Sequence, residues 1–251
     1  MNEKIKQFER EGYFVAENIL TIDESILFRQ LCDDYFDNHP IFHAKGNHGG
    51  GGFAACGFAG QTPELEALNH FHEDSRVLAL AELALGCDDF IYTKHSDLHQ
   101  DIITPWHRDF LDYKNGEVDK KPMPFWEMYD ELNGPEGFWD DNHRIIKIGI
   151  LLQDHRDNDY GLWMRAGSHK KGVLGEERNI NSSAADLIVF DHRIMHRGAV
   201  RQFRDEYSQS RCLLAWGFGL DNKYTRQFMA GCHERQEKAK LSMKLKKEHL
   251  A

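Results

Sequence analysis

The second half of the chain consists of short segments rich in β-branched and aromatic residues. Between residues 88 and 220 these segments are separated by turn residues, and they show no regular alternation with helices. Strands that follow one another in this way favour two packed sheets, as in a sandwich or a jelly-roll barrel. The segments expected to form strands read DFIYTKHSDLH, RIIKIGILLQDH, YGLWMRAG, ADLIVFDH, HRGAVRQF and RCLLAWGFGL. We therefore predict a mainly β fold with flanking helices.

The first part of the chain carries helix signals instead. A short helix is predicted to end at Gly12 and to be followed by a strand. Thr21 and Glu24 have the spacing of a capping box before the amphipathic segment SILFRQLCDDYF. A further helix is predicted over 74–86. The glycine-rich stretch 41–60 lacks the spacing of a phosphate-binding loop, so we interpret it as a flexible connection.

The length of 251 residues suits one large domain, which we expect over 1–251. It divides into a helical N-terminal support over 1–87, a β-barrel core over 88–220 and a C-terminal helix over 221–251. A lid insertion over 110–145 interrupts the core. The insertion is rich in aromatic and acidic residues, and connections this long in a compact domain are often functional. We predict that it covers the substrate, with Trp126 and Trp139 as contact residues.

The charge balance argues against polyanionic partners. Thirty-one basic and 41 acidic side chains give a formal net charge of −10, so neither nucleic acid nor an anionic membrane is expected as a partner. No apolar run approaches the roughly 20 residues that span a bilayer, and the first residues lack the apolar core of a signal peptide. Five scattered cysteines without a C-x-x-C pair indicate a reducing compartment. We predict a cytoplasmic protein with a small-molecule substrate, and the oligomeric state is left open.

Fifteen histidines make a metal site worth seeking, and one tripeptide has the spacing for it. If ITPWHRDF is a strand, His107 and Asp109 point to the barrel interior while Arg108 points to the other surface. One imidazole and one carboxylate can then occupy adjacent positions on a metal ion. The predicted third ligand is His196, which opens the strand after LIVF. His192, in the turn before that strand, is the alternative.

Two histidines and one carboxylate form a facial triad that leaves three positions of an octahedral metal open. This set is typical of non-haem Fe(II) centres that react with O2. Arg211 stands 15 residues after His196 at the start of another predicted strand. Its guanidinium is suited to a bidentate pair with a dicarboxylate cosubstrate on the iron. Arg204, in the preceding turn, is the alternative.

These features together resemble the phytanoyl-CoA dioxygenase family of Fe(II)/2-oxoglutarate-dependent oxygenases. FEREGYFVAENILTIDE is similar to the family's helix–strand–helix entry, WHRD to its metal-binding strand, IGILLQDHRDNDYGLWMRAGSHK to its central hairpin, DLIVFDHRIMHRGA to its distal-histidine region and RCLLAWGF to its arginine-bearing strand. The resemblance implies a double-stranded β-helix (jelly-roll, cupin-like), with Fe(II) on His107, Asp109 and His196 and 2-oxoglutarate on Arg211. The implied reaction uses O2, releases succinate and CO2, and hydroxylates an unactivated C–H bond.

The sequence departs from the family pattern in three places. Ala166 stands where proline is usual in the turn, the interval between His196 and Arg211 is a few residues longer than usual, and the 110–145 insertion is larger than expected. No substrate is therefore carried over from the acyl-CoA members. Halogenating relatives have a small residue in place of the carboxylate, so Asp109 favours hydroxylation over halogenation.

Two other functions could use the same residues. A catalytically silent barrel would bind a small molecule and keep only the metal-site shell, and a metal-dependent hydrolase or isomerase would use the three ligands as a Lewis-acid site. His99 joins the candidate substrate contacts because His95, Asp97 and His99 alternate along one predicted strand. The substrate itself, and the choice between hydroxylation, desaturation and cyclisation, are left open.

Overall fold

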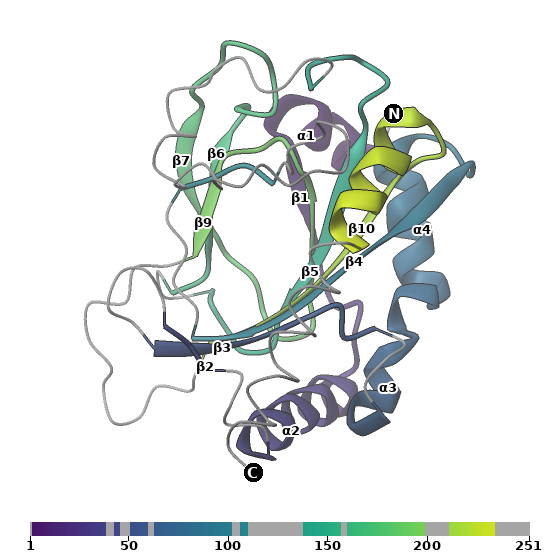
Figure 1. Cartoon of the computed structure of the whole chain (residues 1–251). Helices are drawn as coiled ribbons and strands as arrows, with labels where there is room; N and C mark the ends of the chain where they lie inside the picture. Colours follow the sequence, from purple (N-terminus) through teal and green to yellow (C-terminus); the bar gives the residue numbers. More distant parts are fainter. Residues whose placement is uncertain are drawn as a thin grey trace.

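The computed structural model describes residues 2–38, 43–45, 51–59, 63–101, 106–109, 138–156, 160–198 and 211–233. Within these ranges two antiparallel sheets face each other, and helices cover the outer side of the larger sheet (Figure 1). From β5 to β10 the chain passes repeatedly from one sheet to the other. This is a double-stranded β-helix with flanking helices, and the predicted fold class is confirmed.

The larger sheet has the strand order β1-β8-β5-β10-β4-β3-β2. Its strands are β1 Tyr13–Ala16, β2 His43–Lys45, β3 Gly51–Cys56, β4 Phe90–Gln100, β5 Ile145–Leu151, β8 Leu187–Asp191 and β10 Cys212–Leu220. All seven residues of β5 are buried. The reason is that helices cover one face of this central strand and the smaller sheet covers the other.

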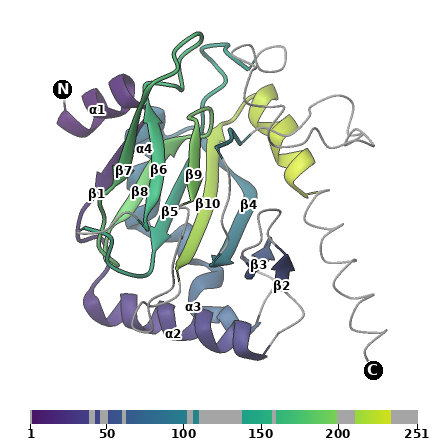
Figure 2. The same ribbon diagram turned by 90° about the vertical axis from the view of Figure 1, so that its left-hand side faces the viewer.

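The smaller sheet has the order β7-β6-β9. Its strands are β6 Leu162–Ala166, β7 Glu176–Ile180 and β9 His196–Gly198. An isolated antiparallel bridge between His107 and His196 extends this sheet beyond β9. Figure 2 shows the strands of the smaller sheet in front of those of the larger one. The predicted ligands His107 and His196 therefore lie at the β9 edge of the smaller sheet.

Side-chain alternation along β5 divides the core into two parts. Ile146, Ile148 and Ile150 belong to the cluster that packs against the helices. Leu151 belongs to a second cluster between the sheets. Because successive side chains of a strand point to opposite faces, Lys147 lies on the same inner side as Leu151. A lysine on the inner face of a fully buried strand is uncommon, and its partner is described below.

The N-terminal helices have the predicted ends. The helices are α1 Glu3–Glu11, α2 Ile22–Asn38 and α4 Ser75–Leu85. Gly12 ends α1 with a φ of 85°, and Gly86 ends α4 with a φ of 77°. Glycine adopts this left-handed conformation without steric cost. Thr21 and Glu24 form the predicted capping box, because each backbone N–H donates to the other side chain at 2.8 and 3.2 Å.

Three shorter turns of helix lie between β3 and α4. They are η2 Pro63–Leu65, α3 Glu66–Asn69 and η3 Phe71–Glu73. A helix over 223–233 follows β10 and matches the start of the predicted C-terminal helix, while 234–251 lies outside the described residues. Residues 110–137 of the predicted lid also lie outside them, and the end of that segment forms a turn and the first residue of β5.

Three local predictions were wrong. The glycine-rich stretch was interpreted as a connection, but it contains β2 and β3, which extend the larger sheet beyond β4. β7 was not predicted because its sequence EERNI is charged, and three of its five residues are exposed. The segment around His107 does not form a regular strand within residues 106–109; only the single bridge to His196 is present.

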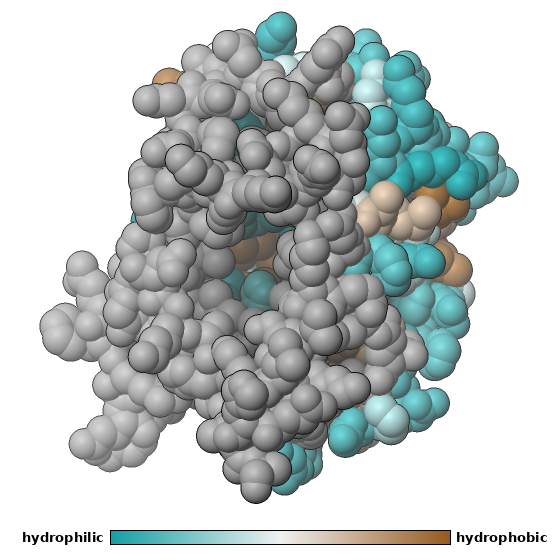
Figure 3. Space-filling view, viewed as in Figure 1, coloured by the Kyte–Doolittle hydropathy of each residue, from teal (hydrophilic) through white to brown (hydrophobic). Residues whose placement is uncertain are grey.

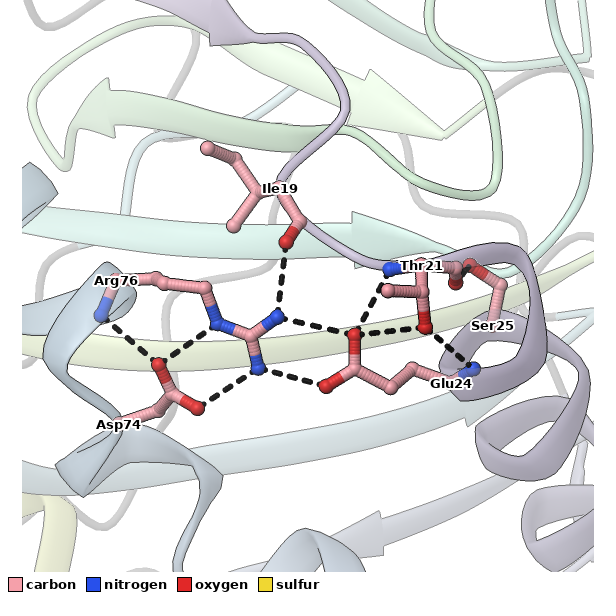
Figure 4. A network of polar contacts seen from close by, with 6 residues as sticks. All are labelled: Ile19, Thr21, Glu24, Ser25, Asp74 and Arg76. Atoms are coloured by element: carbon pink, nitrogen blue, oxygen red, sulfur yellow. Dashed lines mark hydrogen bonds and ion pairs between the residues drawn. The ribbon is translucent and has the colours of Figure 1, made fainter.

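Arg76 joins the start of α4 to the start of α2 (Figure 4). Its guanidinium donates to Glu24 at 2.7 Å, to Asp74 at 2.8 Å and to the carbonyl of Ile19 at 3.0 Å. The hydrogen bonds from Arg76, together with the backbone N–H of Thr21, lower the pKa of Glu24 to about 2. One carboxylate thus serves both the capping box and the link between the two helices.

The outer surface around the helices is largely polar. In Figure 3 the coloured part of the visible face, on the side where α4 lies in Figure 1, is mostly hydrophilic with a few hydrophobic residues among them. Among the described residues, no helix is both long and apolar enough to cross a membrane.

Replacing Arg76 with leucine is expected to lower the free energy of unfolding by about 1–2 kcal/mol. Two carboxylates and a carbonyl lose a charged donor, and water partly compensates because the Arg76 side chain is 34% exposed. Urea unfolding measures the change. Arg226→Leu is the matched control, because its pair with Asp221 is more exposed and should contribute little. Equal losses in the two variants would contradict the role given to Arg76.

Candidate metal centre

Backbone pairing brings His107 and His196 together. The N–H of each donates to the carbonyl of the other at 2.9 Å. The two imidazole centroids are 4.3 Å apart. His196 is also the first residue of β9, where it lies opposite Met164 of β6. The smaller sheet therefore fixes both histidines, although only one of them belongs to a strand.

Asp109 completes the cluster. Its backbone N–H donates to the carbonyl of His192 at 3.2 Å. One carboxylate oxygen lies 3.6 Å from His107 Nε2 and the other 3.5 Å from His196 Nε2. One ligand atom from each of the three side chains lies within 4.8 Å of the others. No other group of His, Cys, Asp or Glu side chains in the described ranges has this arrangement.

A hydrogen bond sets which nitrogen of His196 faces the cluster. Nδ1 lies 3.0 Å from the carbonyl oxygen of Ile194, which can only accept, so Nδ1 carries the proton. The lone pair of Nε2 is then directed toward Asp109. Burial, with a smaller contribution from His107, lowers the pKa of His196 to about 3. The ring is neutral at ordinary pH, which is the state that binds a metal ion.

Lys147 supplies the positive charge next to Asp109. Its Nζ lies 2.7 Å from Asp109 Oδ2, and the two groups form an ion pair. Burial by itself would raise the pKa of Asp109. Lys147, followed by His196 and His107, outweighs burial and holds that pKa well below its usual value. The donor set therefore consists of a charged carboxylate and imidazoles, and it fits a divalent cation.

Gly217 makes room for a second polar group beside Lys147. The two residues lie opposite each other in the β5–β10 pairing. A Cβ on Gly217 would lie 2.4 Å from the hydroxyl oxygen of Thr93 and 3.2 Å from the Cβ of His95. Only glycine at this position allows β4 to approach so closely.

His95 belongs to a buried chain of polar side chains. Its Nε2 lies 2.6 Å from a carboxylate oxygen of Asp97, and its Nδ1 lies 3.7 Å from the Sγ of Cys232 in the C-terminal helix. The carboxylate can only accept, so Nε2 carries the proton and Nδ1 accepts from the thiol. His95 and Asp97 alternate as predicted, and their contact with Cys232 was not foreseen.

Arg211 comes directly before β10 and is buried. In β10, Cys212 belongs to the cluster under the helices and Leu213 packs against the cluster between the sheets. Alternation places Arg211 on the inner side with Leu213. Burial lowers the pKa of Arg211 to about 10, so the guanidinium is still charged at neutral pH. Its role toward a carboxylate stays a prediction.

The remaining predicted residues occupy different places. His192, the alternative ligand, is outside the cluster, and its Nε2 lies 3.1 Å from that of His143. Trp139 packs against Arg108. His99 is half-buried on β4. That Trp139 and His99 contact substrate stays a prediction.

Trp126 and Arg204 lie outside the described residues. Arg108 was expected on the far surface of a strand, but it is only 4% exposed. Lys147 was not predicted as a site residue. The available signal was a lysine inside the apolar run IIKIGIL, where a charged side chain needs a buried partner.

Comparison with solved structures identifies the fold. EvdMO1 is 16% identical with a TM-score of 0.60, and the match covers 88% of this chain and 50% of EvdMO1. The non-heme alpha ketoglutarate dependent epimerase SnoN from nogalamycin biosynthesis is 12% identical with a TM-score of 0.61, and the match covers 87% and 82%. HygX from Streptomyces hygroscopicus is 15% identical with a TM-score of 0.61, and the match covers 88% and 87%.

The chain has the fold of these proteins. It spans half the length of EvdMO1 and most of the length of SnoN and HygX. SnoN has been solved in complex with Fe3+, alpha ketoglutarate and nogalamycin RO, and HygX with nickel and 2-oxoglutarate bound. No family model matches the sequence, and no curated protein matches it. The similarity therefore extends to the fold, and the chemistry has to be argued from the residues.

The buried, neutral His196 makes stability depend on pH. Its pKa is about 3 in the folded protein, against an ordinary value of 6.5 in the unfolded chain. Below pH 6.5 the unfolded chain therefore takes up a proton that the folded chain does not. Stability is therefore present above that value and is lost as the pH falls toward 3. At about pH 5 the loss from this residue is about 2 kcal/mol relative to about pH 8. Urea unfolding of the metal-free protein and of His196→Gln should differ by this amount in their pH dependence, and parallel curves would contradict it.

Lys147→Met removes the positive charge beside Asp109 and keeps the length of the side chain. The metal-free variant is expected to lose roughly 3 kcal/mol of unfolding free energy, because Asp109 remains a buried carboxylate without its cation. A divalent ion supplies that charge and no longer meets the repulsion of an ammonium group. Stabilisation by Co(II) or Mn(II), measured as the shift in unfolding at equal metal concentration, should thus exceed that of the original protein.

Lys147→Arg is the matched control for this experiment, because it keeps the charge. Its stabilisation by metal should stay close to that of the original protein. A smaller metal effect in Lys147→Met than in Lys147→Arg would show that Lys147 is not a competing charge at the centre.

Proposed function

We propose that the protein is a non-haem Fe(II)- and 2-oxoglutarate-dependent dioxygenase that hydroxylates a small molecule at an unactivated C–H bond. The observation that carries the proposal is the buried cluster of His107, Asp109 and His196. Two imidazoles and one carboxylate are the protein ligands of non-haem Fe(II) centres that react with O2. The names of the solved proteins with this fold, and the sequence resemblance to the phytanoyl-CoA dioxygenase family, support the same class of chemistry.

His107, Asp109 and His196 would hold the iron. The bound iron would activate O2, the oxidant, while 2-oxoglutarate would be oxidised to succinate and CO2 as the substrate C–H bond is hydroxylated. The residues of the chain prepare the site for them. The carbonyl of Ile194 keeps the Nε2 lone pair of His196 directed inward, and Lys147 keeps Asp109 ionised and engages one of its oxygens.

Arg211 would bind the far carboxylate of 2-oxoglutarate. Lys147 already offsets the charge of Asp109, so a divalent ion at the cluster adds positive charge to a buried site. A dicarboxylate supplies two negative charges at this position and reduces the cost of burying the cations. The charges inside the fold therefore favour binding of metal and dicarboxylate together.

Hydroxylation is the finer part of the proposal. SnoN is named as an epimerase, so a protein of this fold and cosubstrate can lead to another outcome. The presence of Asp109 favours hydroxylation over halogenation, because the carboxylate occupies the coordination position that a halide would need. Desaturation and cyclisation depend on how the substrate is held near the metal.

Anaerobic addition of Fe(II) and 2-oxoglutarate is expected to produce the weak visible charge-transfer band of their chelate. With O2, a metabolite panel should contain a compound whose oxidation is accompanied by metal-dependent succinate release. Asp109→Ala should abolish the band and the release. Asp154→Ala is the matched control, since this carboxylate is 49% exposed and pairs with Arg156. A protein without band or succinate release would contradict the proposal.

Arg211→Gln separates the cosubstrate from the metal. It should weaken 2-oxoglutarate binding at least about tenfold, because a bidentate charged pair is lost, and leave Fe(II) affinity unchanged. Turnover under nitrogen without 2-oxoglutarate would instead favour a Lewis-acid hydrolase or isomerase. Ligand binding that survives in Asp109→Ala, with no turnover in the original protein, would favour a catalytically silent binding protein.

A further inference from the structure

Arg108 is a buried cation with unused hydrogen-bonding capacity. It is 4% exposed, and its Nη2 donates to the carbonyl of Ser168 at 3.1 Å. Its guanidinium lies 5.3 Å from the centroid of the Trp139 ring. Among the described residues, Nε and Nη1 of Arg108 have no hydrogen-bond acceptor. A buried guanidinium normally satisfies these donors, because leaving them without an acceptor is costly.

Trp139 also has a buried hydrogen-bond donor that is not used. Its indole Nε1 is buried and has no acceptor among the described residues. Two stacked side chains thus present three nitrogen atoms that can only donate. Asp191 is the described carboxylate with an electrostatic effect on Arg108, but Arg193 already holds Asp191 at 2.6 Å. Burial lowers the pKa of Arg108 to about 10, so it keeps its charge at neutral pH.

Arg108 lies at the same end of the fold as the metal cluster. Ser168, which accepts from Arg108, follows β6, and its hydroxyl accepts from the N–H of Met195 at 2.9 Å. Met195 directly precedes His196. The carbonyl of His192, in the same turn, accepts from Asp109. The turns after β6 and β8 therefore surround Arg108 and the cluster together.

Arg211 lies at the other end of the larger sheet. Its neighbour Cys212 accepts from the N–H of Leu152, directly after the end of β5. His192, by contrast, donates its N–H to Ile145 at the start of β5. The two guanidinium groups thus flank the metal cluster from different ends of the strands, and Arg211 is the one on the inner side, where a cosubstrate would extend.

We propose that Arg108 and Trp139 form a subsite for an anionic group of the substrate, a carboxylate or a phosphate. Such a group has only acceptor oxygens, which match the three donors, and its charge compensates the guanidinium. Water would satisfy the donors but leave the charge uncompensated. The inference rests on the proposed function in one respect: the anion belongs to the molecule that is oxidised at the neighbouring metal.

A binding experiment on the metal-free, full-length protein tests the subsite without any turnover. The probes are inorganic phosphate and acetate at constant ionic strength, and the readout is the indole N–H signal of Trp139 by 1H–15N NMR. Trp139→Phe identifies the signal by its absence. Either probe should give a saturable shift, and the stronger one indicates whether the group is a phosphate or a carboxylate.

Arg108→Gln should weaken binding of the better probe at least about tenfold, because the charged hydrogen bonds are lost. Arg108→Lys keeps the charge and should bind better than the glutamine variant, which separates loss of charge from loss of folding. Arg178→Gln is the matched control, since this guanidinium pairs with Glu176 at 2.8 Å and is not among the charges that act on Arg108. No saturable shift in the original protein, or equal binding in Arg108→Gln, would overturn the proposal.

A turnover experiment connects the subsite to the substrate. Succinate release is compared for pairs of metabolites that differ only in a free acid or its methyl ester, or in a phosphate or its alcohol. The anionic member should have the lower KM, and Arg108→Gln should raise that KM while leaving the neutral member unchanged. A phosphate or acetate shift without any succinate release would support the subsite and contradict the proposed function. Equal KM values within every pair would overturn the assignment of the anion to the substrate.

Discussion

The centre of this molecule depends on two backbone hydrogen bonds. His107 and His196 exchange them at 2.9 Å, across 89 residues of chain. They attach a segment that forms no regular strand of its own within 106–109 to the edge of the smaller sheet. Asp109 follows two residues later, and its backbone N–H donates to the carbonyl of His192 in the turn between β8 and β9. This pairing brings His107 to His196, and the bond to His192 then holds the Asp109 carboxylate beside both imidazoles.

Once the cluster is in place, the charges around it determine what the fold can bind. Asp109 and Lys147 compensate each other inside a strand environment that is otherwise apolar. Arg211 and Arg108 are buried cations at the two ends of the same region. A divalent cation at the cluster would add positive charge to this buried region, and an anionic ligand would offset it.

Much of this could be predicted from local sequence signals. Gly12, Gly86 and the Thr21–Glu24 box end or begin helices by rules that involve only neighbouring residues. The strands rich in branched residues were found for the same reason. His107, Asp109 and His196 could be proposed together from the sequence. His107 and Asp109 are two residues apart, and His196 stands at the start of a predicted strand. β7 escaped prediction because it is an edge strand whose exposed, charged residues carry no hydrophobic period.

Lys147 and Arg108 could not be found in this way, because their surroundings come from distant parts of the chain. Lys147 is polar within an apolar run, and nothing local says that Asp109, 38 residues earlier, supplies its counter-charge. Arg108 lies between His107 and Asp109, so strand alternation predicts that its side chain points to the outer surface. It is nevertheless buried, and among the described residues Trp139 and the turn after β6 contact it. Alternation gives the direction of a side chain, whereas the loops that close over it decide whether that direction leads to solvent. The subsite proposed for Arg108 and Trp139 lies beside the turn after β6, so a strand pattern does not reveal it.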